Sequence, residues 1–144
     1  MKKRYYLYIL VMLLIDQLTK FLVIDKTITI IPDFLSIIYT QNYGGALGIG
    51  RLSPIIFLSI ILIIGIIYFM NKCKGKIRNN IPFIMILTGS IGNLFDRLFR
   101  GYVIDFIKFN IFDFPCFNFA DIFIVIGIIL LVIFLVLGKK EKEL

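Results

Sequence analysis

The stretch from Ile122 to Leu137 reads IFIVIGIILLVIFLVL, an unbroken apolar run with Gly127 inside it. Asp121 precedes the run, and Gly138 and lysines follow it. A helix over residues 121–138 approaches the length needed to cross a hydrocarbon core of about 30 Å. This run decides the class of protein, because a soluble domain has no place for a helix that is apolar on every side.

Three further stretches read as spans, over residues 5–24, 54–70 and 81–99. The second carries no ionisable group, whereas the third is interrupted by small and polar residues and is the least apolar. The sequence therefore predicts an all-α polytopic membrane protein with four transmembrane helices. We expect residues 1–144 to form a single membrane domain.

The composition agrees with this class and narrows the chemistry. The chain has 144 residues, of which 60% are hydrophobic and 17% are charged, and its mean hydropathy is +0.97. Histidine is absent. The absence excludes a Ser-His-Asp triad, a Cys-His pair and an H-E-x-x-H zinc helix. Any catalysis must use carboxylates, lysine, cysteine or hydroxyls.

The formal charge of +7 indicates orientation rather than nucleic-acid binding, because the cations gather beside the apolar runs. The three clusters are Lys2, Lys3 and Arg4; Lys72, Lys74, Lys76 and Arg78; and Lys139, Lys140 and Lys142. The positive-inside rule then predicts that both termini are cytoplasmic. We expect the first helix to be retained and not cleaved as a signal peptide, because Asp16 and Lys20 lie inside it and no small-residue cleavage site follows it. Residues 25–53 and 100–120 are extracytoplasmic in this topology. Cys73 and Cys116 lie on opposite sides of the membrane, so they cannot form a disulfide.

The first extracytoplasmic segment predicts a small β-like cradle between the first and second helices. Ile28–Ile31 and Leu35–Thr40 read as short strands. A glycine-rich stretch follows over residues 42–50, but no Lys-Ser/Thr succeeds it, which disfavours a phosphate-binding loop. Tyr102–Phe114 alternates apolar and polar residues, and it either pairs with the first segment or lies along the membrane interface.

Ionisable residues within the predicted spans gather at one depth. Asp16 and Lys20 are an i,i+4 pair in the outer half of the first helix, and Asn93 and Arg97 are an i,i+4 pair near the outer end of the third. Such groups normally face the interior of a helix bundle and mark a site. The competing interpretation is structural, with Asp16 paired to Lys20 and either Asp96 or Asp16 paired to Arg97.

Two carboxylates at the outer boundary, Asp105 and Asp121, have no obvious basic partner nearby in the sequence. Asp121 alone could be a helix cap and Asp105 a loop residue that bonds its own backbone. Together they could share one proton and activate a water molecule, as in aspartic proteases. The sequence therefore predicts an aspartyl dyad at the extracytoplasmic face.

Four strings, read in order, resemble the bacterial lipoprotein signal peptidase family, signal peptidase II, over nearly the whole chain. They are Asp16-Gln17-Leu18-Thr19-Lys20; Asn42-x-Gly44-x-Ala46; Gly92-Asn93-x-x-Asp96-Arg97-x-x-x-Gly101-x-Val103-x-Asp105-Phe106; and Phe117-Asn118-x-Ala120-Asp121. The chain departs from the usual pattern at two places. Thr88-Gly89 stands where a Gly-Gly pair is common, and Leu47 follows Ala46 where an aromatic residue is common.

The resemblance implies an aspartyl endopeptidase of the bacterial cytoplasmic (inner) membrane. It would remove the signal peptide from diacylglyceryl-modified prolipoproteins, cleaving before the lipidated cysteine, with Asp105 and Asp121 as the catalytic pair. Neither metal nor organic cofactor is implied, and globomycin-type peptides are the expected inhibitors. The implied substrate-binding or dyad-supporting residues are Asp16, Lys20, Asn42, Asn93, Asp96, Arg97, Asn118 and Ala120.

Three other interpretations of the same residues stay open at this point. Lys20 and a hydroxyl such as Ser90 could form a Ser-Lys peptidase. Asp16, Lys20, Asp96 and Arg97 could instead serve a small proton- or ion-coupled transporter, although the fourth span offers no polar group to continue a path. A purely structural membrane protein is the third interpretation, and in that case the outer carboxylates would be replaceable.

Overall fold

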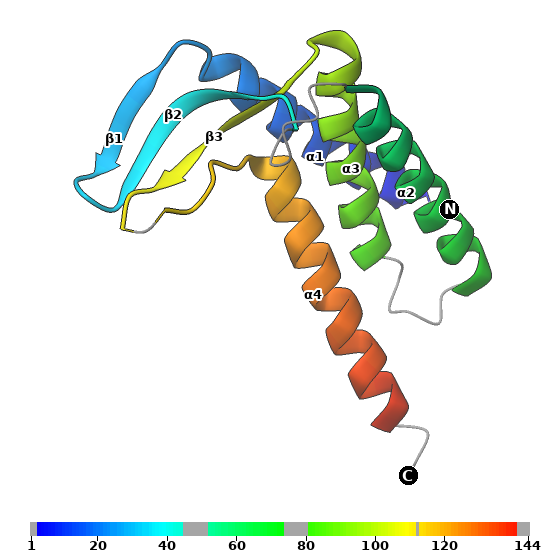
Figure 1. Ribbon diagram of the computed structural model, residues 1–144. Helices are drawn as coiled ribbons and strands as arrows, with labels where there is room; N and C mark the ends of the chain where they lie inside the picture. The colour runs from blue at the N-terminus through cyan, green and yellow to red at the C-terminus, as the bar shows by residue number, and fades with distance from the viewer. Residues whose placement is uncertain (1–2, 45–51, 74–80, 112, 141–144) are drawn as a thin grey trace.

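The computed structural model describes residues 3–44, 52–73, 81–111 and 113–140. Within these residues the chain forms four helices and one three-stranded sheet (Figure 1). The helices are α1 (Lys3–Leu22), α2 (Leu52–Cys73), α3 (Ile81–Phe99) and α4 (Phe119–Lys140). The strands are β1 (Thr27–Ile31), β2 (Leu35–Asn42) and β3 (Val103–Phe109).

The predicted third helix has the observed bounds, and the other three differ by two or three residues at their ends. α1 begins and ends two residues earlier than predicted, whereas α2 and α4 extend beyond the predicted range in both directions. Hydropathy marks the apolar part of a helix, while the backbone hydrogen bonds continue into polar flanks. After α1, the chain turns at Asp25, which has a positive φ of 57°.

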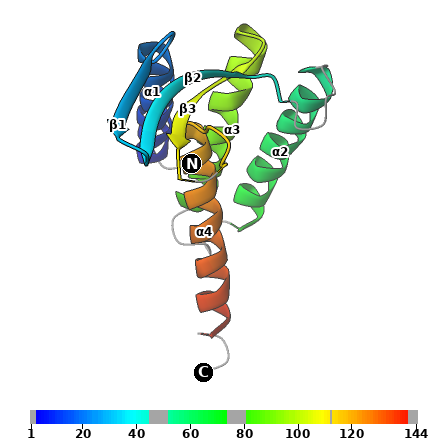
Figure 2. The same cartoon turned by 60° about the vertical axis from the view of Figure 1, so that its left-hand side comes forward.

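α1, α2 and α4 are long and apolar enough to cross a membrane, over Arg4–Leu22, Pro54–Lys72 and Phe119–Val136. Only 17%, 11% and 11% of these windows are buried inside the protein, so most of their apolar surface requires a lipid environment. α3 does not belong to this set, because its polar residues lower its hydropathy. It is instead the buried helix, and it contacts each of the other described helices (Figures 1 and 2).

The sheet has the antiparallel order β1-β2-β3 and lies at the end of the helices where α1 and α3 stop and α4 starts (Figure 1). The predicted strands of the first segment are present, extended to Thr27 and to Asn42. The second segment pairs with them, in a register that places Asp105 opposite Thr40. The β structure is thus not confined to the segment between the first two helices, and the fold is not all-α.

Close packing of α3 on α4 depends on glycine. A Cβ on Gly89 would overlap the carbonyl oxygen of Ala120, and one on Gly127 would lie 2.7 Å from the Ile86 side chain. Small residues allow this approach of two helix backbones. Thr88, the departure next to Gly89, is buried, and its hydroxyl donates to the carbonyl of Ile84 at 2.7 Å.

Apolar and polar contacts occupy different ends of the helices. The apolar core lies away from the sheet, around the first turns of α1 and α3 and the last turns of α2, and its members are Tyr5, Ile66, Met70, Phe83, Ile84, Ile86 and Leu87. The buried polar side chains of α1 and α3 lie nearer the sheet. This separation leaves a polar site where the sheet meets the helices.

Candidate active site

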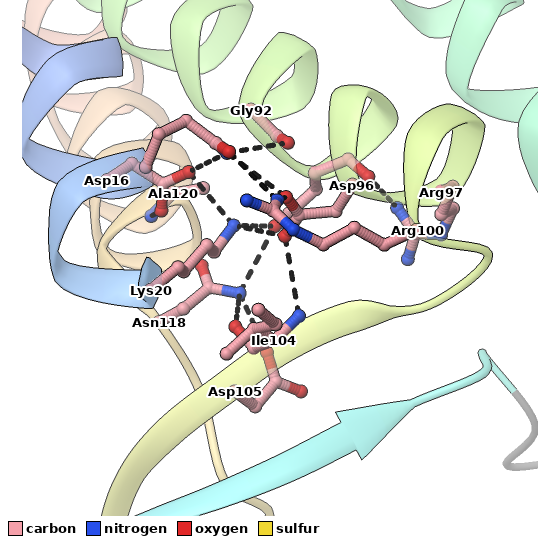
Figure 3. A network of polar contacts seen from close by, with 12 residues as sticks. Asp16, Lys20, Gly92, Asp96, Arg97, Arg100, Ile104, Asp105, Asn118 and Ala120 are labelled. Carbon is pink, nitrogen blue, oxygen red and sulfur yellow. Dashed lines mark hydrogen bonds and ion pairs between the residues drawn. The ribbon is translucent and has the colours of Figure 1, made fainter. Parts of the chain in front are cut away.

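A buried ammonium group forms the centre of the polar site. Lys20 is 0% exposed, and its Nζ lies 2.9 Å from Asp16 Oδ2 and 2.8 Å from Asp96 Oδ2 (Figure 3). It also donates to Asn93 Oδ1 at 3.0 Å. The predicted pairing of Asp16 with Lys20 is confirmed. A buried cation of this kind is stable only with such partners, so α1 and α3 are locked together here.

The partners of Asp96 differ from the structural interpretation of the sequence. Asp96 forms ion pairs with Lys20 and with Arg100, and its Oδ1 also accepts the Gln17 amide at 3.1 Å. Its pairing with Arg97 was wrong, because adjacent residues on a helix point in different directions. Sequence reasoning missed Arg100 and Gln17. Only the i,i+4 spacing of Asp96 and Arg100 could have indicated the former.

Gln17 joins the two helices at several points. Its Nε2 lies 3.0 Å from Asp16 Oδ2 and 3.4 Å from the carbonyl of Gly92, and its Oε1 accepts Arg100 at 2.9 Å. Gly92 leaves room for this arrangement, since a Cβ there would lie 2.7 Å from Asp16 Oδ2. The amide therefore contributes to the network that positions both carboxylates.

Asp121 caps α4 together with Asn118. The backbone N–H of Asn118 donates to Asp121 Oδ2 at 3.1 Å, and the N–H of Asp121 donates to Asn118 Oδ1 at 3.0 Å. This reciprocal pair is a capping box. The backbone N–H of Ala120, also in the first turn of α4, donates to Asp16 Oδ1 at 3.0 Å. Asn118 is thus the N-cap residue and Asp121 the acid of the first turn, and their two hydrogen bonds fix the Asp121 carboxylate in space.

Asp105 lies on β3 and is 3% exposed, not in a loop. Its Oδ2 accepts the Asn42 amide at 2.8 Å and its Oδ1 accepts the Asn118 amide at 2.7 Å. Burial, reinforced by the negative charge of Asp121, raises the pKa of Asp105 from 3.8 to about 6, although the two amides oppose the shift. A carboxyl group of this kind can exchange a proton near neutral pH.

Two asparagines connect the carboxylates. Asn93 donates to Asp121 Oδ1 at 2.8 Å, and Asn118, which donates to Asp105, also donates to Asn93 Oδ1 at 3.1 Å. The orientation of the Asn93 amide is determined, because its oxygen accepts from both Lys20 and Asn118. Its NH₂ group must then face Asp121. One continuous network holds both carboxylates.

Arg97 is near this network but only partly engaged. Its Nη1 donates to the Asn93 carbonyl at 3.3 Å, and the charges of Asp121 and Asp105 act on its guanidinium group. Its buried Nε has no hydrogen-bond partner among the described residues. The Ser90 hydroxyl is likewise buried without a partner there, and Lys20 bonds elsewhere.

The structure brings together every predicted site residue. All ten lie in or directly beside the network, with Ala120 contributing its backbone N–H rather than its side chain. Ala46, Leu47 and the cations at 74, 76 and 78 lie outside the described residues. In the part of the chain that is described, no group of three or more His, Cys, Asp or Glu residues could hold a metal ion.

Comparison with known proteins identifies the family of this chain. The family model for signal peptidase (SPase) II matches residues 8–137. The lipoprotein signal peptidase of Caldicellulosiruptor bescii is 39% identical over 146 residues, which cover 97% of this chain and 95% of that protein. Its counterpart from Staphylococcus aureus is 38% identical over 141 residues, covering 89% and 86%.

A solved bacterial membrane enzyme has the same fold. It superposes with a TM-score of 0.82 at 30% identity, over 98% of this chain and 92% of that one. A second bacterial membrane enzyme gives a TM-score of 0.81 at 31% identity, covering 93% of each chain. The chain therefore belongs to the signal peptidase II family of membrane peptidases.

Proposed function

We propose that this protein is an aspartyl endopeptidase that removes the signal peptide from diacylglyceryl-modified prolipoproteins, cleaving before the lipidated cysteine. The observation that carries the proposal is the joined pair of carboxylates, Asp105 and Asp121, linked through Asn93 and Asn118. The family membership supports the choice of substrate.

The reaction requires one proton to be shared between the two carboxyl groups. The ionised aspartate takes a proton from water as the water oxygen attacks the scissile carbonyl carbon. The protonated aspartate hydrogen-bonds the carbonyl oxygen, and the C–N bond then breaks as a proton passes to the leaving nitrogen. The products are a signal peptide with a new carboxylate and a lipoprotein with a free amino group on its cysteine. A pKa of about 6 for Asp105 suits this exchange.

The surrounding residues divide into two groups in this proposal. Arg97 and Asn42 serve the substrate side, because the unpartnered Nε of Arg97 is suited to a substrate carbonyl and Asn42 extends to Asp105 from the sheet. Residues that support the dyad are Asp16, Lys20, Asn93, Asp96, Asn118 and Ala120. Their mutual hydrogen bonds hold the two carboxylates in one geometry.

We place the protein in the bacterial inner membrane, with four crossing helices and both termini cytoplasmic. α3 has 19 residues and spans roughly 28 Å at 1.5 Å per residue, so it has the length to cross. Its polar residues are buried against the other helices instead of facing lipid. The dyad would then lie near the extracytoplasmic face, where the diacylglyceryl chains stay in the bilayer and globomycin-type peptides could compete with the substrate.

Labelling of Cys116 tests this orientation. The thiol is free and half-buried, and it lies two residues before Asn118. With Cys73 replaced by serine, a membrane-impermeant maleimide should modify Cys116 in intact spheroplasts. Modification only after the membrane is opened would place the site on the cytoplasmic side.

The catalytic proposal is tested by cleavage of a diacylated prolipoprotein in detergent. Asp105→Asn and Asp121→Asn should each lower kcat by a factor of about 10³ or more, because each removes one partner of the acid–base pair. Asp113→Asn is the matched control, since its carboxylate is fully exposed on the same segment as Asp105. Near-normal turnover by a folded Asp105 or Asp121 variant would contradict the aspartyl mechanism.

The rival interpretations gain no support. Lys20 Nζ is held by Asp16, Asp96 and Asn93, and among the described residues no hydrogen bond joins it to Ser90. Ser90→Ala should therefore retain cleavage. The polar network also stays at the sheet end of the helices, while the other end holds the apolar core, so a path for an ion is missing among the described residues.

A further inference from the structure

Arg100 follows the last residue of α3, and neither the resemblance nor the predicted site included it. We propose that Arg100 is a positioning residue for the dyad: by holding Asp96, it fixes the strand backbone that carries Asp105. The inference rests on the proposed function and deepens it. The family strings leave this position open between Arg97 and Gly101.

Asp96 closes the turn that leads from α3 into β3. Its backbone carbonyl accepts the Arg100 N–H at 2.8 Å, and its Oδ1 pairs with the Arg100 guanidinium group. Its Oδ2 accepts the backbone N–H of Ile104 at 3.3 Å. Between these points Gly101 adopts a positive φ of 83°, which reverses the chain. One carboxylate therefore bonds both sides of the turn (Figure 3).

The backbone of Ile104, the residue before Asp105, is held on both sides. Asp96 accepts the N–H of Ile104, while Asn118 donates to the Ile104 carbonyl at 3.3 Å and to Asp105 Oδ1 at 2.7 Å. Asn118 also caps α4 with Asp121. The position of Asp105 relative to Asp121 thus depends on Asp96 on one side and Asn118 on the other.

The charges of the cluster show why Asp96 needs Arg100. Two buried carboxylates, Asp16 and Asp96, face two cations, Lys20 and Arg100, so the group is neutral. Without Arg100, both carboxylates would share the single ammonium group of Lys20. Displacement of Asp96 would relieve the excess negative charge, and this change weakens its bond to Ile104.

No neighbouring residue replaces Arg100 in this task. Gln17 accepts from Arg100 at 2.9 Å and donates to Asp96, but it carries no charge. Arg97 is adjacent to Asp96 in the sequence, so its side chain points in a different direction from the Asp96 carboxylate, and it donates to the Asn93 carbonyl instead. The Arg100 side chain is 24% exposed, so its replacement leaves no cavity in the core.

The experiment compares Arg100→Gln and Arg100→Lys with the wild type in the prolipoprotein cleavage assay. The expected result for Arg100→Gln is a fall in kcat of about 10- to 100-fold, since a shift of about 1 Å between reacting groups has that effect, with KM within about twofold. Arg100→Lys keeps the charge and should recover most of the rate. Lys26→Gln, which removes an exposed cation at the turn after α1, should match the wild type.

Wild-type kcat in Arg100→Gln, or equal losses in the Gln and Lys variants, would overturn the proposal. If Arg100→Gln does not purify as folded protein, the double variant Asp96→Asn/Arg100→Gln, whose buried cluster is neutral again, is compared with Asp96→Asn alone. Equal kcat values support action through Asp96, and a further fall of about tenfold contradicts it. Failure of the wild type to cleave, or cleavage by Asp105→Asn, would refute the proposed function instead.

Discussion

Replacement of Gly89 by alanine tests whether the contact between α3 and α4 sets the geometry of the site. The added Cβ would overlap the Ala120 carbonyl oxygen and lie 2.7 Å from Ile124 Cγ1. Because the first obstacle is backbone, no side-chain rotation removes it, and α4 must move by about 1 Å. Overpacking of this kind costs about 1–3 kcal/mol, and alanine returns about 1 kcal/mol of helix propensity. The expected net loss of stability is therefore at most about 2 kcal/mol.

The displacement acts directly on the candidate dyad. The N–H of Ala120 bonds to Asp16, and Asp121 is the next residue, so a shift of α4 moves Asp121 relative to Asp105 on the sheet. A misplacement of about 1 Å can lower turnover by about 100-fold. Gly89→Ala should therefore lose more activity than its loss of stability explains.

Gly65→Ala is the matched control, because a Cβ at this position of α2 meets no atom within 4 Å. Both variants would be purified in detergent and compared by thermal unfolding and by prolipoprotein cleavage. Gly89→Ala should lower Tm by no more than about 6 °C, given about 3 °C per kcal/mol for a chain of this size. Gly65→Ala should leave turnover unchanged. Equal behaviour of the two variants in both assays would refute the packing argument.

Two further predictions concern Asp105. The Asn42 amide lowers the pKa of Asp105, so Asn42→Ala should raise that pKa. The change in kcat/KM that reports the titration of Asp105, near pH 6, should then move to higher pH. An unchanged pH profile would contradict the assignment. Because the pKa is raised from 3.8 to about 6 on folding, the native state binds more protons than the unfolded state in that range, and stability falls as pH rises through it. Asp105→Asn removes this penalty of up to about 3 kcal/mol and should raise Tm at about pH 8 but not near pH 4. A Tm difference that is the same at both pH values would count against the buried carboxylate as its cause.

Local periodicity predicted the parts of the site that lie on single helices. The pair Asp16–Lys20 follows from a spacing of four residues, and the position of Asp121 in the first turn of its helix follows from its place just before the apolar run; both are present. Helix direction, inferred from the flanking cations, placed Asn93 at the same depth as Lys20, and the two side chains bond. These inferences need only helix geometry, which the sequence carries directly.

Partner choice between elements could not be predicted in the same way. Asp96 had two arginines within four residues, and only the packed structure shows that it pairs with Arg100. The backbone donors of Ile104 and Ala120 carry no side-chain signal in the sequence. For the segment with Asp105, the sequence allowed either pairing with the first extracytoplasmic segment or a position along the membrane interface. A short alternating segment forms a strand only when the edge of another strand is available to it.

The two carboxylates belong to different parts of the fold, since Asp105 lies on a strand of the sheet and Asp121 in the first turn of a helix. Neither part alone contains both carboxylates of the dyad. A newly synthesised chain whose sheet has not yet seated on its helices would therefore be unable to hydrolyse the membrane proteins around it. Completion of folding would itself assemble the dyad and so make the protease active.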